Sequence, residues 1–167
     1  MISLDTMICD LVAPGYMRRM GDYVCQTAPG EILGVTLNVK ATPAPIVGCA
    51  TYTPELLDDK DIIEVTVDGR AHYPLVATAG QRMAVADPED MAIRFREIRD
   101  CRVGQYAIIP YPENDRMNLV MAAITKLSRW GGWWAQPEFA PGVGATMATL
   151  KVERGKSYTT LAGVVWL

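Results

Sequence analysis

Short segments that alternate hydrophobic and polar or small residues recur along the chain, and glycine and proline separate them. Between residues 33 and 39 every second residue is Leu or Val, which is the pattern of a β-strand with one buried face. A second strand is predicted from Ile46 to Tyr52. Pro43 and Pro45 lie between the two segments, so residues 41–45 predict an extended connection outside the sheet.

A hairpin is predicted around Asp68-Gly69, a pair that favours tight turns between strands. A three-residue loop, 67–69, collects the apolar side chains of both strands on one face. A two-residue loop would instead mix polar and apolar side chains on both faces. Because a shift of one residue moves every side chain to the other face, we predict the hairpin with the three-residue loop and a left-handed glycine.

Two segments carry patterns of both helix and strand. Asp87-Pro88 is typical of a helix start, and Met91, Phe95 and Ile98 follow at helical spacing, so we predict a helix of about three turns within 88–100. The alternation of Met91, Ile93 and Phe95 leaves a strand as the alternative there. Residues 117–127 have the same ambiguity between an amphipathic helix and a buried strand.

Near the C-terminus, two strands are predicted at 146–153 and 156–166, joined at Arg154-Gly155. Many short strands with frequent turn residues indicate a mainly β fold. We predict one β-sandwich or barrel-like domain over residues 1–167, with one or two short helices. An inserted or appended subdomain at 87–134 is the alternative organisation.

Composition excludes several classes of protein. The chain has 167 residues, of which 50% are hydrophobic and 21% charged, as in a globular domain. A net charge of −3 argues against binding driven by nucleic-acid phosphates and against a polybasic membrane anchor. The first residues lack a signal-peptide pattern, and no run of 18 apolar residues occurs. We therefore expect a protein made in the cytoplasm, with neither nucleic acid nor membrane as partner.

Few residues suited to catalysis or to metal binding occur. The chain has a single histidine, His72, no G-x-S-x-G motif, and four cysteines without a C-x-x-C pair. We therefore predict no catalytic residue, no metal site and no cofactor. A small enzyme that uses His72 with Glu64 or Asp68 is a minor alternative, because the favoured interpretation places His72 on a strand surface opposite Glu64.

Two groups of side chains are candidates for contacting another protein. The first is a tryptophan group interrupted by two glycines, and the second is a basic group interleaved with acids: Trp130, Trp133 and Trp134; Arg94, Arg96 and Arg99. The tryptophans could instead plug the core or stack on a sugar or base. The arginines could instead form a salt-bridged face.

Residues 63–88 contain a strand, an Asp-Gly turn, a second strand, an Ala-Gly link and a closing Asp87-Pro88. In this order they resemble small bacteriophage capsid decoration (cement) proteins, as do the short strands at Gly34-Val35 and 162–165. Ala86 replaces the glycine that is usual before Asp-Pro. The resemblance covers about a third of the chain and carries no catalytic residue.

This resemblance implies a non-enzymatic structural protein of the virion that stabilises a phage head by binding between capsid subunits. The implied partners are the major capsid protein or other virion subunits, and the implied state is a homo-oligomer, with a trimer favoured. Alternatives are a head-completion or tail component of the particle, or a carbohydrate-binding β module that uses the loop from Trp130 to Trp134.

Overall fold

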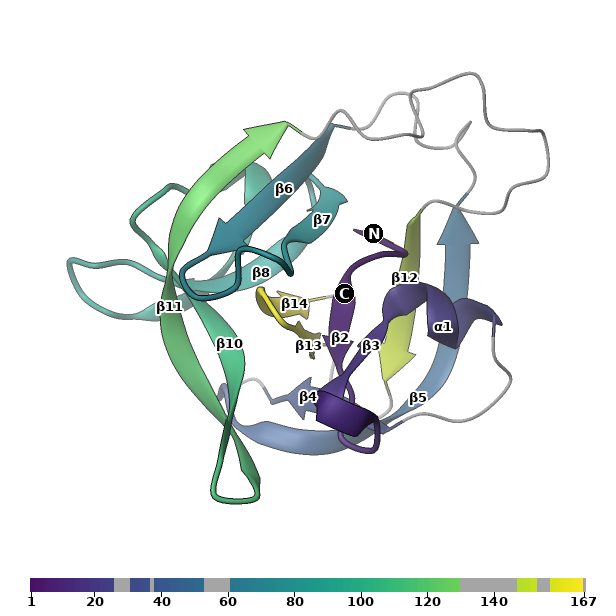
Figure 1. Cartoon of the computed structure of the whole chain (residues 1–167). Helices are drawn as coiled ribbons and strands as arrows, with labels where there is room; N and C mark the ends of the chain where they lie inside the picture. Colours follow the sequence, from purple (N-terminus) through teal and green to yellow (C-terminus); the bar gives the residue numbers. More distant parts are fainter. Residues whose placement is uncertain (26–30, 37, 53–60, 130–146, 153–156, 167) are drawn as a thin grey trace.

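The computed structural model describes the chain except for residues 26–30, 37, 53–60, 130–146, 153–156 and 167 (Figure 1). Strands dominate, with one short α-helix and short 3-10 turns, so the predicted mainly β class is confirmed. No helix in this described part is long and apolar enough to cross a membrane.

The elements follow one another along the chain with short connections. In the first third they are β1 (Ile2–Ser3), β2 (Met7–Cys9), η1 (Pro14–Tyr16), β3 (Met17–Arg19), α1 (Met20–Cys25), β4 (Glu31–Val35) and β5 (Ala41–Tyr52). In the middle they are β6 (Ile62–Val67), β7 (Leu75–Thr78), β8 (Arg82–Ala86), β9 (Ile93–Glu97), η3 (Ile98–Asp100), β10 (Tyr106–Glu113) and β11 (Arg116–Arg129). The last are β12 (Met147–Val152), β13 (Ser157–Thr160) and β14 (Gly163–Trp166).

The strands form one sheet that closes on itself. Neighbours pair in the order β14-β8-β10-β11-β6-β7-β1-β12-β5-β4-β13-β2-β3, β9 pairs with β8, and β13 also pairs with β14. The last pairing completes a ring. The long strands β5 and β11 bend around the molecule and change partners midway, with a register shift between Ile124 and Lys126 in β11 (Figure 1). The ring encloses the main hydrophobic core, which includes Ile2, Val65, Leu75, Ile124, Leu150 and Tyr158.

The hairpin around Asp68-Gly69 is wider than predicted. β6 ends at Val67 and β7 begins at Leu75, so residues 68–74 form the connection, and the prediction of a three-residue loop was wrong. The reason is that the end of β6 pairs with β11 instead, where Val67 lies opposite Ile124. Gly69 does have the expected left-handed conformation, with φ of 73°.

The helix predicted within 88–100 is also wrong. Residues 93–97 form β9, which pairs with β8 from Ile93↔Ala86 to Glu97↔Arg82. Residues 88–90 form a turn, closed by a hydrogen bond from the Met91 N–H to the Asp87 carbonyl at 2.8 Å, and Met91 leaves this turn with a positive φ of 55°. Residues 117–127 lie in β11, so the strand alternative is the right one in both segments.

Two further expectations about connections were wrong. Pro43 and Pro45 lie inside β5, in the part that pairs with β4 while β12 pairs only from Ile46 onward. Proline has no N–H to donate, so it fits a strand segment with one neighbour. The strands predicted at 146–153 and 156–166 do not pair with each other, because β12 joins β1 and β5 while residues 157–166 form the pair β13–β14.

Candidate functional site: the two chain ends at Gln81

The side chain of Gln81 joins the two ends of the chain. Its Oε1 accepts a hydrogen bond from the amino nitrogen of Met1 at 2.7 Å. Its Nε2 donates to the carbonyl oxygens of Trp166 and Arg82. Gln81 is only 6% exposed, so its carboxamide is a buried bridge between Met1 and Trp166, the last described residue. Figure 1 marks the two ends of the chain N and C.

Backbone pairing brings these three residues together. Ile2 of β1 lies opposite Ala77 of β7, which places Met1 beside the turn that follows β7. Trp166 of β14 lies opposite Arg82 of β8, which places its carbonyl beside the start of β8. Gln81 lies in the connection between β7 and β8, so the two pairings deliver both chain ends to its side chain.

The backbone of Gln81 is held on both sides. Its N–H donates to the carbonyl of Thr78 at 2.9 Å, and its carbonyl accepts from the N–H of Ile98 at 2.9 Å. Thr78 in turn holds Met1: its N–H lies 3.0 Å and its hydroxyl 3.5 Å from the Met1 carbonyl oxygen. We name Met1, Thr78, Gln81 and Trp166 the junction site.

Hydrogen-bond donors face a peptide carbonyl at both chain ends of the junction site. Fixed donors of this kind stabilise the negative charge that develops on a carbonyl oxygen when a nucleophile attacks the carbon. The side chains of Met1 and Trp166 carry neither hydroxyl nor thiol. The arrangement can therefore hold and polarise the carbonyls, while an attacking group must come from elsewhere.

The amino group of Met1 is buried, and burial lowers its pKa from the ordinary 8.0 to about 6. In a chain that begins at Met1, the unfolded state binds this proton between pH 6 and 8 and the folded state does not. The free energy of unfolding should therefore rise with pH across this window, by about 2 kcal/mol. Urea unfolding at pH 5.5 and 8.5 measures the change, and N-terminal acetylation should remove this contribution. An equal pH dependence in the acetylated protein would contradict the assignment.

Of the cysteines that the structure describes, two are unsuited to nucleophilic attack at neutral pH, and the third lies on a strand outside the junction site. Burial raises the pKa of the Cys9 thiol to about 12 and that of Cys101 to about 11, so both stay protonated. Cys49 is exposed on β5. Among the described residues, no group of three or more His, Cys, Asp and Glu side chains could hold a metal ion.

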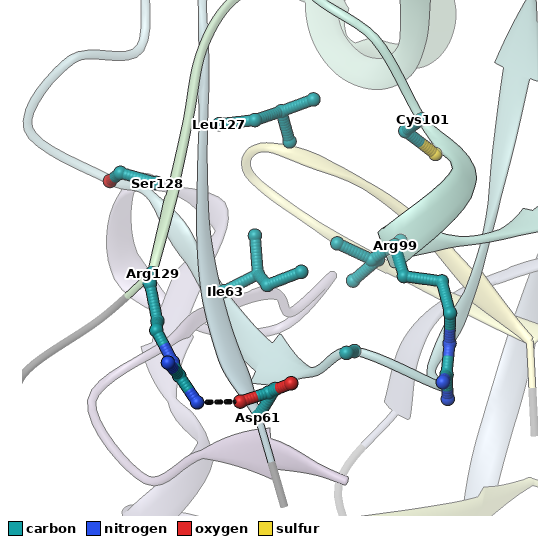
Figure 2. A pocket seen from close by; sticks show the side chains of 9 residues that line it. Asp61, Ile63, Arg99, Cys101, Leu127, Ser128 and Arg129 are labelled. Carbon is teal, nitrogen blue, oxygen red and sulfur yellow. Dashed lines mark hydrogen bonds and ion pairs between the residues drawn. The ribbon is translucent and has the colours of Figure 1, made fainter.

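A pocket of about 350 Å³ adjoins the turn that carries Gln81. Ala79 of this turn forms part of the wall, and its N–H donates to the Asp61 carbonyl at 2.8 Å. Figure 2 shows an ion pair between Asp61 and Arg129 on one side of the pocket and Arg99 on the other. Apolar side chains of β6, β11 and η3 line its interior.

The predicted pair of His72 and Glu64 does not form. His72 is exposed in the 68–74 connection, and Glu64 lies opposite Val76, so the predicted pair of His72 and Glu64 is absent. Glu64 instead lies 3.6 Å from Lys126. The wider hairpin described above causes this difference.

The predicted arginine group forms salt bridges within the chain. Arg94 contacts Asp87 at 2.9 Å and Asp90 at 2.5 Å, and the hydrogen bond from Arg94 lowers the pKa of Asp90 to about 2. Arg96 also contacts Asp87, at 2.8 Å, and Arg99 contacts Glu97 at 2.8 Å. Contact of these arginines with another protein stays a prediction. Trp130, Trp133 and Trp134 lie outside the described residues.

Sequence reasoning missed every member of the junction site. Gln81 follows Ala79-Gly80 and looks like an ordinary turn residue, while Thr78 ends an apolar strand. No local pattern indicates that residues 1 and 166 meet, because their meeting depends on two separate strand pairings.

Comparison with known proteins places the fold. The chain matches no family model and no curated protein. Its structure is similar to a DnaB intein from Synechocystis sp. PCC 6803, with a TM-score of 0.69 and 15% identity over 99% of this chain and 96% of that one. It is also similar to the transcription factor IIB Mvu mini-intein, with a TM-score of 0.65 and 11% identity over 100% of both chains. A further neighbour is the AceL NrdHF class 3 split intein, with a TM-score of 0.62, 10% identity and coverage of 99% and 96%.

These similarities overturn the expectation of a capsid decoration protein. The resemblance was carried by residues 63–88, a local strand-turn-strand order that the structure explains as β6, β7 and β8 of a different fold. The virion role, the head or tail role, the carbohydrate module, the capsid partners and the trimer lose their support with it. The expectation of a non-enzymatic protein is contradicted as well, because inteins are self-splicing elements. The protein has the fold of inteins.

Proposed function

We propose that the protein is a self-processing element of the intein type, which lies within a longer precursor and cleaves a peptide bond at its own end. The observation that carries the proposal is the buried bridge through Gln81 between Met1 and Trp166. The similar structures are inteins, whose activity is self-splicing, and this supports the same general class of activity.

Joined ends suit an element that acts on its own flanking chain. A segment inserted in a longer polypeptide has one connection at each end, and here both connections would leave the domain at Gln81. Groups held at such a site react within one molecule, which replaces a bimolecular encounter by a fixed orientation. A single buried carboxamide could thus serve both connections, with its oxygen toward one and its nitrogen toward the other.

The side chains of the junction site favour hydrolysis as the reaction. In the AceL neighbour, the variant described as splice inactive has alanine in place of one cysteine and one asparagine. In this chain Met1 and Trp166 carry no thiol, hydroxyl or carboxamide. We therefore propose that water attacks the carbonyl carbon of Trp166 and that Gln81 Nε2 stabilises the developing oxyanion. The bond to the Leu167 nitrogen then breaks, and that nitrogen takes up the proton.

The proposal is tested with the chain placed between two folded reporter domains. The parent fusion should separate after Trp166 over time, as followed by gel electrophoresis and intact mass. Gln81→Glu keeps an acceptor for Met1 but replaces the donor to Trp166 by a second acceptor. This variant should slow the cleavage by about 100-fold, the typical effect of removing one oxyanion donor.

Gln105 provides a matched control. It is equally buried, at 6% exposed, and its amide bonds the Arg102 N–H at 2.8 Å and Asp87, away from the chain ends. Gln105→Glu should cleave at the parent rate. Equal slowing in both variants would indicate a general loss of stability and contradict the role of Gln81. A parent fusion that stays intact over days would contradict self-processing.

A further inference from the structure

A second cavity, of about 80 Å³, lies between the pair β2–β3 and the hairpin of β10 and β11. Three sulfur-containing side chains line it, each from a different strand: Cys9 of β2, Met17 of β3 and Met117 of β11. None of the described residues around this cavity is His, Asp or Glu, and none belongs to the junction site. The cavity is therefore a separate site in which sulfur is the available ligand atom.

The strand register places two of the sulfur side chains next to each other. Cys9 lies opposite Met17, so their side chains share one face of the β2–β3 pair. The N–H of Asp10 donates to the Tyr16 carbonyl at 3.1 Å, which makes Asp10 and Tyr16 a hydrogen-bonded pair. Hydrogen-bonded and non-hydrogen-bonded pairs alternate along an antiparallel ladder, so Cys9 and Met17 form a non-hydrogen-bonded pair. Opposed side chains come closest at pairs of this type.

The end of the Met17 side chain lies at the wall of the cavity. Its terminal methyl carbon is 3.8 Å from the position that a Cβ on Gly15 would occupy, and Gly15 also lines the cavity. Met117 comes from the opposite wall, where it pairs with Pro112, another lining residue. Met17 and Met117 are half-buried and Cys9 is fully buried. Because methionine is unbranched and flexible, both thioethers can turn toward an ion beside the thiol.

We propose that this cavity binds Cu(I), with the Cys9 thiolate and the thioether sulfurs of Met17 and Met117 as ligands. Thiolate and thioether are soft ligands and select Cu(I), whereas hard cations such as Mg²⁺ and Ca²⁺ require oxygen ligands. The volume exceeds what a single water molecule requires, so the ion fits without opening the core. The inference is independent of the proposed self-processing, because it uses no residue of the junction site.

The charges around the cavity favour a monovalent ion. One thiolate neutralises one positive charge, so Cu(I) and the Cys9 sulfur form a neutral pair. The lining residues also include Arg70, whose Nη2 donates to the Pro110 carbonyl at 2.8 Å. A divalent ion would leave an uncompensated positive charge beside this guanidinium, which is unfavourable in a partly buried site.

Binding must displace the thiol proton. Burial and the neighbouring Asp10 raise the pKa of the Cys9 thiol to about 12, while Arg70 acts to lower it. At neutral pH the S–H bond therefore breaks as the S–Cu bond forms, and the proton passes to the solvent. The oxidation state of the metal does not change. The bound ion would join β2 and β3 to β11, which are not neighbours in the sheet order.

The ligands are identified by nuclear magnetic resonance of the nine methionine methyl groups, labelled with carbon-13. The full chain carries Cys25→Ser and Cys49→Ser, which remove two other thiols. One equivalent of Cu(I), added without oxygen, should shift two methyl signals, which the variants Met17→Leu and Met117→Leu assign. The signal of Met121, exposed on the same strand β11, should stay in place. Unchanged signals of Met17 and Met117 would overturn the site.

Affinity is measured by competition with bicinchoninate, a coloured chelator of Cu(I). Cys9→Ala should abolish binding of the first equivalent, and Met17→Leu and Met117→Leu should each weaken it by about 10-fold or more. Leucine is close to methionine in volume, so these variants should keep the fold, as circular dichroism checks. Met121→Leu is the matched control and should bind with the parent affinity. Equal affinity in all of these variants would show that Cu(I) binds elsewhere and would overturn the proposal.

Zn(II) tests whether the site is selective for a soft monovalent ion. Zinc sites usually have four ligands from thiolate, imidazole and carboxylate, and this cavity supplies one thiolate. One equivalent of Zn(II) should therefore leave the signals of Met17 and Met117 unchanged and should not displace Cu(I). Displacement, or the same two shifts with Zn(II), would contradict the assignment to Cu(I).

Discussion

Replacement of Asp10 by alanine is expected to lower the free energy of unfolding by about 3–4 kcal/mol. The Asp10 carboxylate is fully buried and accepts hydrogen bonds from the N–H groups of Val12 at 2.9 Å and Ala13 at 3.0 Å. It also accepts from the Tyr23 hydroxyl at 2.6 Å and lies 3.6 Å from the Arg18 guanidinium. Its loss leaves a buried hydroxyl without an acceptor and a half-buried cation without its counter-ion.

Urea unfolding followed by circular dichroism measures this effect, and Asp5→Ala is the matched control. The Asp5 side chain is 68% exposed and lies 3.9 Å from Arg19, so its removal should change the free energy by less than about 0.5 kcal/mol. If Asp10→Ala loses no more than Asp5→Ala, the carboxylate does not stabilise the fold.

A second large effect is expected for Gly34→Ala, which should lower the free energy of unfolding by about 2–3 kcal/mol. A Cβ at Gly34 would lie 2.6 Å from the Ala44 Cβ and 3.2 Å from the Thr42 carbonyl oxygen. The strand cannot move away, because Gly34 in β4 pairs with Thr42 in β5 on one side and with Tyr158 in β13 on the other. The added methyl group must therefore displace paired backbone.

Two variants show whether this contact causes the loss. Ala44→Gly removes the atom that the new Cβ meets, so combining it with Gly34→Ala should cost less than the sum of the two single changes. Gly163→Ala is the control, because its Cβ would meet the terminal methyl of Met83 at 2.9 Å, and that flexible side chain can move. Strict additivity, or an equal loss for Gly163→Ala, would contradict the steric explanation.

Much of the strand content was predictable from local pattern. Alternation at 33–39 and at 63–65 indicated strands, and β4 and β6 lie there. The first strand is shorter than predicted: β4 ends at Val35, and Val39, with a φ of 57°, lies in the turn that leads to β5. Gly69 adopts the positive φ that a turn glycine favours. These features depend on neighbouring residues alone, so one sequence is enough to indicate them.

The local pattern gave the wrong prediction where a side chain or a strand end has several possible partners in the fold. Asp87 has the signature of a helix cap, but its carboxylate instead binds Arg94, Arg96 and Gln105. These contacts join β8, β9 and β10 and hold the segment extended. Similarly, the end of β6 pairs with β11 and not with β7, which moved His72 away from Glu64. In both cases long-range pairing outweighed a preference that is worth about 1 kcal/mol.

The sequence by itself determined the mainly β class, because that class follows from residue types and their spacing. Only the tertiary structure decided the closed sheet and the junction site. Gln81 is 80 residues from Met1 and 85 from Trp166 along the chain. The pairings of β1 with β7 and of β14 with β8 bring the three residues together, and the burial that they create makes an ordinary glutamine the link between both chain ends.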